Sequence, residues 1–199
     1  MKYITSIWTS IALIVLLTIV RISDPHLIEQ IRLNTFDLYI KTIPEQKSDD
    51  IVIVDIGEKS LGLYGQFPWP RQEYAQMIDT LRKANAGLII FTIMFPEEDR
   101  WGGDQRFAEW MEENGIILSQ DADAFGRDKK APYVGYATFG PGEPLDFLYK
   151  YKGLITNIDI LEDKAWGIGL VNAAPEVDNI TRRIPLLSQI NGEVYPSLA

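Results

Sequence analysis

Acidic residues follow two apolar segments of this chain. Asp55 lies near the end of the run DIVIVDI, and Glu58 comes shortly after it. Asp99 and Asp104 follow the run GLIIFTIMF. If both runs are strands of one parallel sheet, these side chains meet at the carboxyl ends of the strands, where ligands collect. Carboxylate oxygens are the groups that hold hard cations. The same residues also fit a second role as helix caps and solvated loop charges, since a carboxylate stabilises the free N–H groups of a helix start.

The stretch GQFPWPRQEYA, residues 65–75, brings an aromatic ring and a cation toward these acids. Its two prolines fix their own φ and push Phe67 and Trp69 toward extended backbone, so the segment is stiff. Trp69 and Arg71 are therefore held in place, either as ligand contacts or as a packed corner in which Arg71 neutralises the acids. The candidate ligand-binding residues are Asp55, Glu58, Trp69, Arg71 and Asp104.

Composition and motifs exclude several classes of function. The 199 residues carry a formal net charge of -9, which opposes binding to nucleic acid or anionic lipid. The chain has no cysteine and a single histidine, His26, so thiolate and imidazole metal clusters are excluded. The sequence contains no GxxxxGK[ST], GxGxxG, HExxH or GxSxG motif. We therefore assign no catalytic residue, no metal ligand and no cofactor.

The N-terminus has the pattern of a membrane anchor. Residues 3–20, YITSIWTSIALIVLLTIV, carry no charge and span about 27 Å as a helix. Lys2 and Arg21 bracket this run, and no small-x-small cleavage pattern follows it. We expect residues 1–22 to form an uncleaved transmembrane helix in the cell membrane, with the main domain extracytoplasmic. A cleavable signal peptide and a buried helix are the alternatives.

Residues 23–45 are expected to form a connecting helix and linker. In HLIEQIRLNTFDLYIK, apolar residues recur from Leu27 to Leu38 at helical spacing. Such a helix transmits displacement, pairs with a second copy to give a homodimer, or only packs against its own domain. The sequence leaves these three roles open.

Residues 46–199 are expected to form an α/β domain. We predict three strands, DIVIVDI, GLIIFTIMF and IILSQ, that alternate with two helices. The first helix begins after Pro70, and the second covers DQRFAEWMEENG and ends at Gly115. Further strands are predicted at residues 133–138, 168–172, 184–190 and 193–195, the last two joined by a turn at NG. The expected fold is a mixed, largely parallel sheet covered by helices.

Several ordered motifs resemble one family, the CHASE type 2 extracellular sensor domain. They are FDLY, IVIVDIGEKSL, WPR, LIIFTIMFPE, DQRFAEWM, GLVNAAPEVDNITRRIPLL and YPSLA, and the resemblance covers about residues 36–199. It implies an extracytoplasmic input domain of a bacterial transmembrane receptor, with a cytoplasmic cyclase or kinase module as output. The resemblance implies no established ligand.

The chain departs from the family pattern at two places. Thr92 stands where the family usually has an aspartate, and the chain stops at YPSLA, where the family pattern continues toward further membrane spans. We therefore expect a domain truncated at its C-terminal end, which binds an unidentified small signal and is not itself an enzyme. A metal-assisted hydrolase using the acidic residues and a ligand-free dimerisation domain are the alternative functions.

Overall fold

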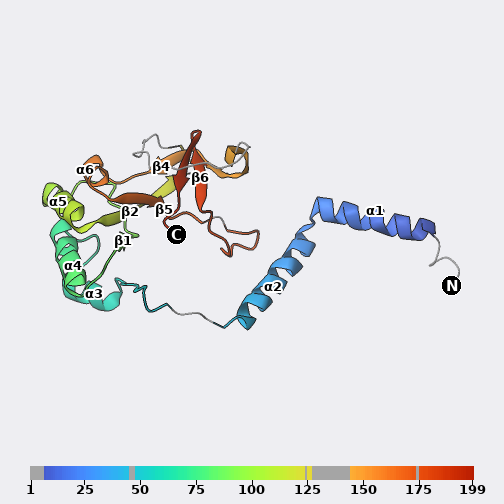
Figure 1. Ribbon diagram of the computed structural model, residues 1–199, viewed down its shortest axis with the longest axis horizontal. Coiled ribbons are helices and arrows are strands. Elements are labelled where there is room, and N and C mark those ends of the chain that lie inside the picture. The colour runs from blue at the N-terminus through green and yellow to red at the C-terminus, as the bar shows by residue number, and fades with distance from the viewer. Residues whose placement is uncertain (1–6, 45–47, 124, 127–143, 174) are drawn as a thin grey trace. The chain divides into compact units, whose positions relative to one another are not determined.

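The structure is a computed structural model that describes the chain except for residues 1–6, 45–47, 124, 127–143 and 174. The chain divides into two compact units. Met1–Val54 and Val177–Asn179 form the first unit, and Asp55–Glu176 and Ile180–Ala199 form the second. Figure 1 shows both units and labels most of their helices and strands.

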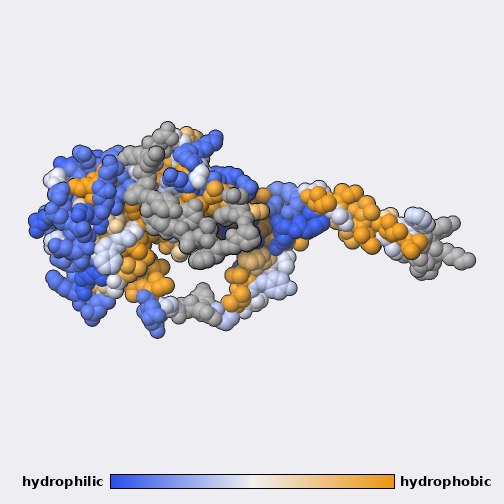
Figure 2. Space-filling view, turned by 45° about the horizontal axis from the view of Figure 1, so that its top comes forward, coloured by the Kyte–Doolittle hydropathy of each residue, from blue (hydrophilic) through white to orange (hydrophobic). Residues whose placement is uncertain are grey.

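Two helices, α1 (Ile7–Ser23) and α2 (His26–Thr42), belong to the first unit and are bent by 79° relative to each other. Pro25 is the N-cap of α2, where its missing N–H is no loss. No single helix among the described residues has the length and apolar composition to cross a membrane, whereas the bent pair together does. The surface of α1 is mostly hydrophobic in Figure 2. These features support a membrane span only weakly.

Strands of the second unit form two small mixed sheets. In one sheet β2 pairs in parallel with β1 and β5 and antiparallel with β4. In the other, β6 pairs in parallel with β3 and antiparallel with β7. The strands are β1 (Ile89–Phe91), β2 (Ile116–Asp123), β3 (Tyr149–Tyr151), β4 (Gly153–Ile155), β5 (Gly167–Leu170), β6 (Leu187–Ile190) and β7 (Glu193–Pro196).

Helices of the second unit begin and end at recognisable sequence signals. The helix α4 begins directly after Pro70, and α5 ends at Gly115, whose φ of 62° is left-handed and favours glycine. Figure 1 shows α4, α5 and α6 close together beside β1 and β2. The helices are α3 (Glu58–Tyr64), α4 (Arg71–Lys83), α5 (Asp104–Asn114) and α6 (Asp159–Glu162), and a 3-10 helix covers Pro144–Phe147.

Aromatic side chains dominate the core between these helices and the first sheet. Tyr74, Phe91, Phe95 and Phe107 form six ring pairs with centroids 5.2–6.3 Å apart, most of them edge to face. All four residues are at most 4% exposed. Edge-to-face packing matches the positive ring edges with the negative ring faces. The core thereby fixes α4, α5 and the segment around Phe95 relative to β1.

Most of the predicted elements are present. The helices α2, α4 and α5 and the strands β2 and β5 are confirmed. The turn between β6 and β7 lies at Asn191 and Gly192, both with positive φ, as the NG pair predicts. The strand predicted at residues 133–138 lies outside the described residues.

Two expectations about the sheet are wrong. The run DIVIVDI, residues 50–56, forms no strand, because no described neighbouring strand supplies the hydrogen-bond ladder that it needs, and Ile51, Val52, Ile53 and Val54 are exposed. The strands also form two small sheets and not one, although the pairings β1–β2, β2–β5 and β3–β6 are parallel and only β2–β4 and β6–β7 are antiparallel among the described strands. The coarser prediction of a mixed α/β fold is confirmed.

Candidate functional site

Arg71 is the first residue of α4, and it is 6% exposed. Pro70 precedes it with φ −56° and ψ 148°, and the Phe67–Pro68 peptide bond is cis. The indole N–H of Trp69 donates to the Gly65 carbonyl over 2.9 Å, which fixes the ring. This stiff segment therefore directs Arg71 inward, as its prolines predict. We call residues 67–74 and 95–104 together the arginine corner.

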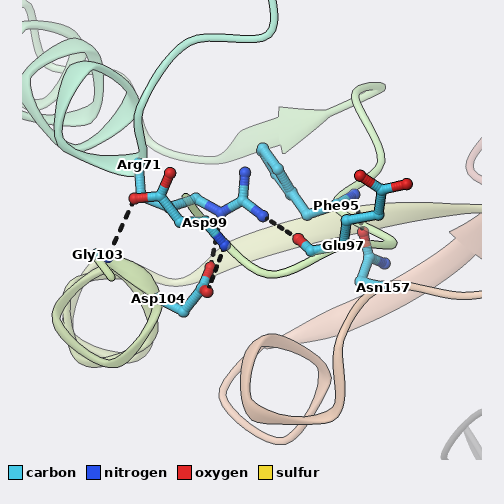
Figure 3. Close-up of polar contacts among 7 residues, drawn as sticks. All are labelled: Arg71, Phe95, Glu97, Asp99, Gly103, Asp104 and Asn157. Carbon is cyan, nitrogen blue, oxygen red and sulfur yellow. Dashed lines mark hydrogen bonds and ion pairs between the residues drawn. The ribbon is translucent and has the colours of Figure 1, made fainter. Parts of the chain in front are cut away.

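The guanidinium of Arg71 holds the segment after β1 to the start of α4. Its Nε donates to Asp104 Oδ1 over 2.9 Å, and its Nη2 donates to the Glu97 carbonyl over 2.6 Å. Its Cζ also lies 4.5 Å from the centre of the Phe95 ring, a cation–π contact. The side chains of Arg71 and Asp104 are 7% and 14% exposed, so the ion pair is poorly screened by water. Figure 3 shows these contacts.

The carboxylate of Asp104 does not cap its own helix. Although Asp104 is the first residue of α5, no side chain caps this helix, and Asp104 Oδ2 instead accepts from the Asp99 N–H over 2.7 Å. Asp99 Oδ2 in turn accepts from the Gly103 N–H over 3.0 Å. The interpretation of Asp104 as a helix cap is therefore wrong, since both of its oxygens bind the arginine corner.

Gly103 is required by close packing. A Cβ on this residue would lie 2.7 Å from Asp99 Oδ2 and 3.1 Å from the Cβ of Arg71. Contacts this short force neighbouring atoms to move. The tight approach of the 99–104 loop to Arg71 thus depends on the absence of a side chain at Gly103.

Asn157, which the sequence did not single out, supports the same segment from the opposite side. Its Oδ1 accepts from the Phe95 N–H over 2.8 Å, and its Nδ2 donates to the Ser119 carbonyl over 2.9 Å. Its own N–H donates to Glu162 Oε1 over 2.9 Å. All three hydrogen bonds are buried, and each is stronger because the surroundings have a low dielectric constant. Asn157 thereby ties Phe95 to β2 and α6.

A cavity of about 220 Å³ opens in the arginine corner. Apolar and aromatic side chains supply most of its walls, and Trp69 and Arg71 are both part of the lining. The rest of the lining is Phe67, Pro68, Tyr74, Ile93, Met94, Phe95, Pro96, Glu97, Glu98, Asp99, Arg100 and Trp101. An apolar cavity with a few polar groups is the usual form of a small-molecule site.

Tyr74 contributes a buried hydroxyl group to this cavity lining. Burial raises the pKa of this hydroxyl, while the nearby backbone of Trp69 and the charge of Arg71 partly oppose the rise. The group is therefore a neutral donor at physiological pH. Although the Trp69 backbone is close, the hydroxyl makes no hydrogen bond of normal geometry with any described residue.

The predicted site residues separate into two groups. Trp69 and Arg71 line the cavity, and Asp104 binds Arg71. Asp55 and Glu58 are exposed and do not belong to the cavity lining. Within the part of the chain that the structure describes, no three His, Asp or Glu residues are grouped in a way that could hold a metal ion. Ligand binding by any of these residues stays a prediction.

Thr92, the departure from the family pattern, lies directly after β1 and is exposed. The cavity lining begins one residue later, at Ile93. The position thus lies beside the candidate site without being part of its lining.

Comparison with known proteins gives one match. The model of the CHASE2 domain family matches residues 11–199, which is nearly the whole chain. No curated protein and no solved structure matches the chain.

Proposed function

Because the chain belongs to the CHASE2 domain family, whose members are extracellular sensory domains of signalling proteins, we propose that it is the input domain of a membrane-bound receptor. The cavity of the arginine corner binds a small extracytoplasmic signal. The domain itself catalyses no reaction, and a cytoplasmic cyclase or kinase module of the same receptor gives the output. The N-terminal helices anchor the domain in the cell membrane.

One observation carries this proposal: the cavity lining includes Arg71, a buried cation whose side chain is held in place by three contacts. Arg71 is fixed by Asp104, by the Glu97 carbonyl and by Phe95. A preorganised site loses little entropy when a ligand binds, so its contacts are fully expressed as affinity. The exposed acids Asp55 and Glu58 offer no comparable arrangement.

The contacts of Phe95 supply a route by which binding changes the fold. Its ring lines the cavity and packs on Arg71, whereas its N–H is held by Asn157 and its carbonyl accepts from the Ile158 N–H over 2.9 Å. A ligand that displaces Phe95 therefore shifts the segment that leads into α6. Signalling further requires that the ligand bind two conformations unequally. We propose α2, the predicted connecting helix, as the element whose conformation carries the change toward the membrane.

The test is thermal unfolding of the full chain in detergent micelles with a panel of small metabolites, nucleotides and divalent cations. Selective binding to the folded state raises the midpoint temperature. We expect one class of metabolite to raise it, and we expect the rise to persist in Asp55→Asn and to become smaller in Tyr74→Phe or Trp101→Ala. A rise with divalent cations alone would contradict this proposal and favour the metal-assisted hydrolase. A well-folded chain that responds to no compound would also contradict it and favour the dimerisation domain.

A further inference from the structure

The floor of the cavity offers hydrogen-bond donors that the described chain does not use. Arg71 donates through Nε and Nη2, but its Nη1 has no partner among the described residues. In Figure 3 the Nη1 group points away from both Asp104 and the Glu97 carbonyl. The Tyr74 hydroxyl is likewise unpartnered there, and this side chain is 1% exposed. The Tyr74 hydroxyl is thus a buried donor without an acceptor, which is unfavourable, and an acceptor oxygen from a ligand would satisfy it and also pair with the charged Nη1 of Arg71.

The opening of the same cavity carries acceptors. Glu97 and Glu98 are exposed and Asp99 is half-buried, and all three belong to the lining. They outnumber the two guanidinium groups of the lining, Arg71 and Arg100. A ligand with several negative charges, such as a nucleotide, is therefore repelled at the opening. A ligand with only a positive charge meets Arg71 at the floor and is also disfavoured.

Between floor and opening the walls are aromatic. Phe67 and Trp101 are exposed, Trp69 is 8% exposed, and all three line the cavity. Their flat faces suit a ring in offset or edge-to-face contact. The cavity of about 220 Å³ is smaller than the roughly 300–1,000 Å³ of sites for drug-sized ligands, so the ligand is a small molecule.

We propose that this cavity binds a free aromatic amino acid. The α-carboxylate accepts from Arg71 Nη1 and the Tyr74 hydroxyl, the α-ammonium donates to the carboxylates of Glu98 and Asp99, and the side-chain ring packs between Phe67 and Trp101. A zwitterion is the charge arrangement that satisfies the floor and the opening together. This inference rests on the proposed function, because it names the ligand of the same site.

The test is calorimetric titration of the full chain in detergent micelles with L-phenylalanine, L-tyrosine and L-tryptophan. The tightest binder is then compared with its two analogues that lack the carboxylate or the ammonium group. We expect each analogue to bind at least about tenfold more weakly, since hydrogen bonds to charged groups are the strong ones. Equal binding of the amino acid and either analogue would overturn the inference.

Two matched variants assign the contacts. Tyr74→Phe removes only a hydroxyl that has no partner, and we expect it to weaken the amino acid and its ammonium-free analogue about fivefold while leaving the carboxylate-free analogue unchanged. Glu98→Gln is exposed and keeps its shape, and it should weaken the amino acid and the carboxylate-free analogue instead. A uniform effect of either variant on all three compounds would contradict the proposed orientation.

The outcomes separate this inference from the proposed function. If no aromatic amino acid binds, but another metabolite stabilises the chain and has a smaller effect in Tyr74→Phe or Trp101→Ala, the sensory role of the cavity is supported and the amino-acid ligand is overturned. If no compound binds a well-folded chain, both are overturned. An amino acid whose binding is unaffected by Tyr74→Phe, Glu98→Gln and Trp101→Ala would overturn this cavity as its site.

Discussion

The arginine corner and residues 51–58 have similar patterns in the sequence but different surroundings in the structure. Each combines an apolar segment with acids. In the arginine corner the carboxylates of Asp99 and Asp104 accept specific hydrogen bonds, and Arg71 and Asp104 form a nearly buried ion pair. In residues 51–58, Ile51 and Val54 are exposed, as are Asp55 and Glu58. A charged residue becomes a structural or binding group only when the fold removes water and supplies a partner.

The largest expected effect is that of Arg71→Ala. The change leaves the Asp104 carboxylate without its cation and frees the Glu97 carbonyl, so we expect a loss of about 3 kcal/mol in the free energy of unfolding. Urea unfolding of the full chain in micelles measures it. Arg71→Lys is the matched control, and it should recover only part of the loss because a lysine cannot bind Asp104 and Glu97 with the same planar fork. If Arg71→Lys recovered the full unfolding free energy, the positive charge alone would stabilise the arginine corner.

Asn157→Ala should have the next largest effect. It leaves the Phe95 N–H and the Ser119 carbonyl buried without partners, which costs about 2–3 kcal/mol of unfolding free energy. Hydrogen exchange gives the sharper measurement, because protection of the Phe95 amide should fall more than that of the amides in α5. Asn157→Asp keeps the acceptor for Phe95 and loses the donor to Ser119, so it separates the two bonds. Unchanged protection of the Phe95 amide in Asn157→Ala would show that Asn157 does not stabilise the arginine corner.

Gly103→Ala should be less damaging. The added Cβ displaces the Asp99 carboxylate and presses on Arg71, and overpacking of this kind costs about 1–2 kcal/mol. The same substitution at the exposed Gly62, where a Cβ meets no atom within 4 Å, is the control. Thermal unfolding of both variants measures the difference. Equal midpoints would show that the 99–104 loop is less tightly packed than the structure indicates.

Asp55→Asn and Glu58→Gln should change least. Both residues are exposed and outside the cavity lining, so we expect changes within about 0.5 kcal/mol of unfolding free energy. Ligand-induced stabilisation should also be unchanged. A loss of ligand response in either variant, with folding intact, would reverse the comparison and return these acids to the binding site.

Local signals were readable from the sequence, and partners distant in the chain were not. The prolines around Trp69, the stop at Gly115 and the turn at Asn191 each act within a few residues, and each prediction is confirmed. Asn157 carries no such signal, since its role depends on Phe95, 62 positions earlier.

Two of the wrong predictions, the strand at DIVIVDI and the helix cap at Asp104, have the same origin. A run of branched residues favours extended backbone, but a strand also needs a neighbouring strand to pair with, and the sequence of residues 50–56 does not specify which one that would be. A carboxylate at a helix start favours capping, but Asp104 meets the stronger donor Arg71, 33 positions away. Both errors arise because the sequence pattern specifies the residue and not its partner.

The proposed double use of Arg71, as a ligand contact and as the partner of Asp104, limits how such a receptor can acquire a new specificity. Any substitution there alters the ligand contact and loosens the loop at once, so the floor of the cavity is difficult to modify in one mutational step. Glu98 and Trp101 contact the same cavity from exposed positions, where substitutions cost little stability. Receptors that sense different compounds with this architecture should therefore diverge first at these two positions, and should replace Arg71 only together with Asp104.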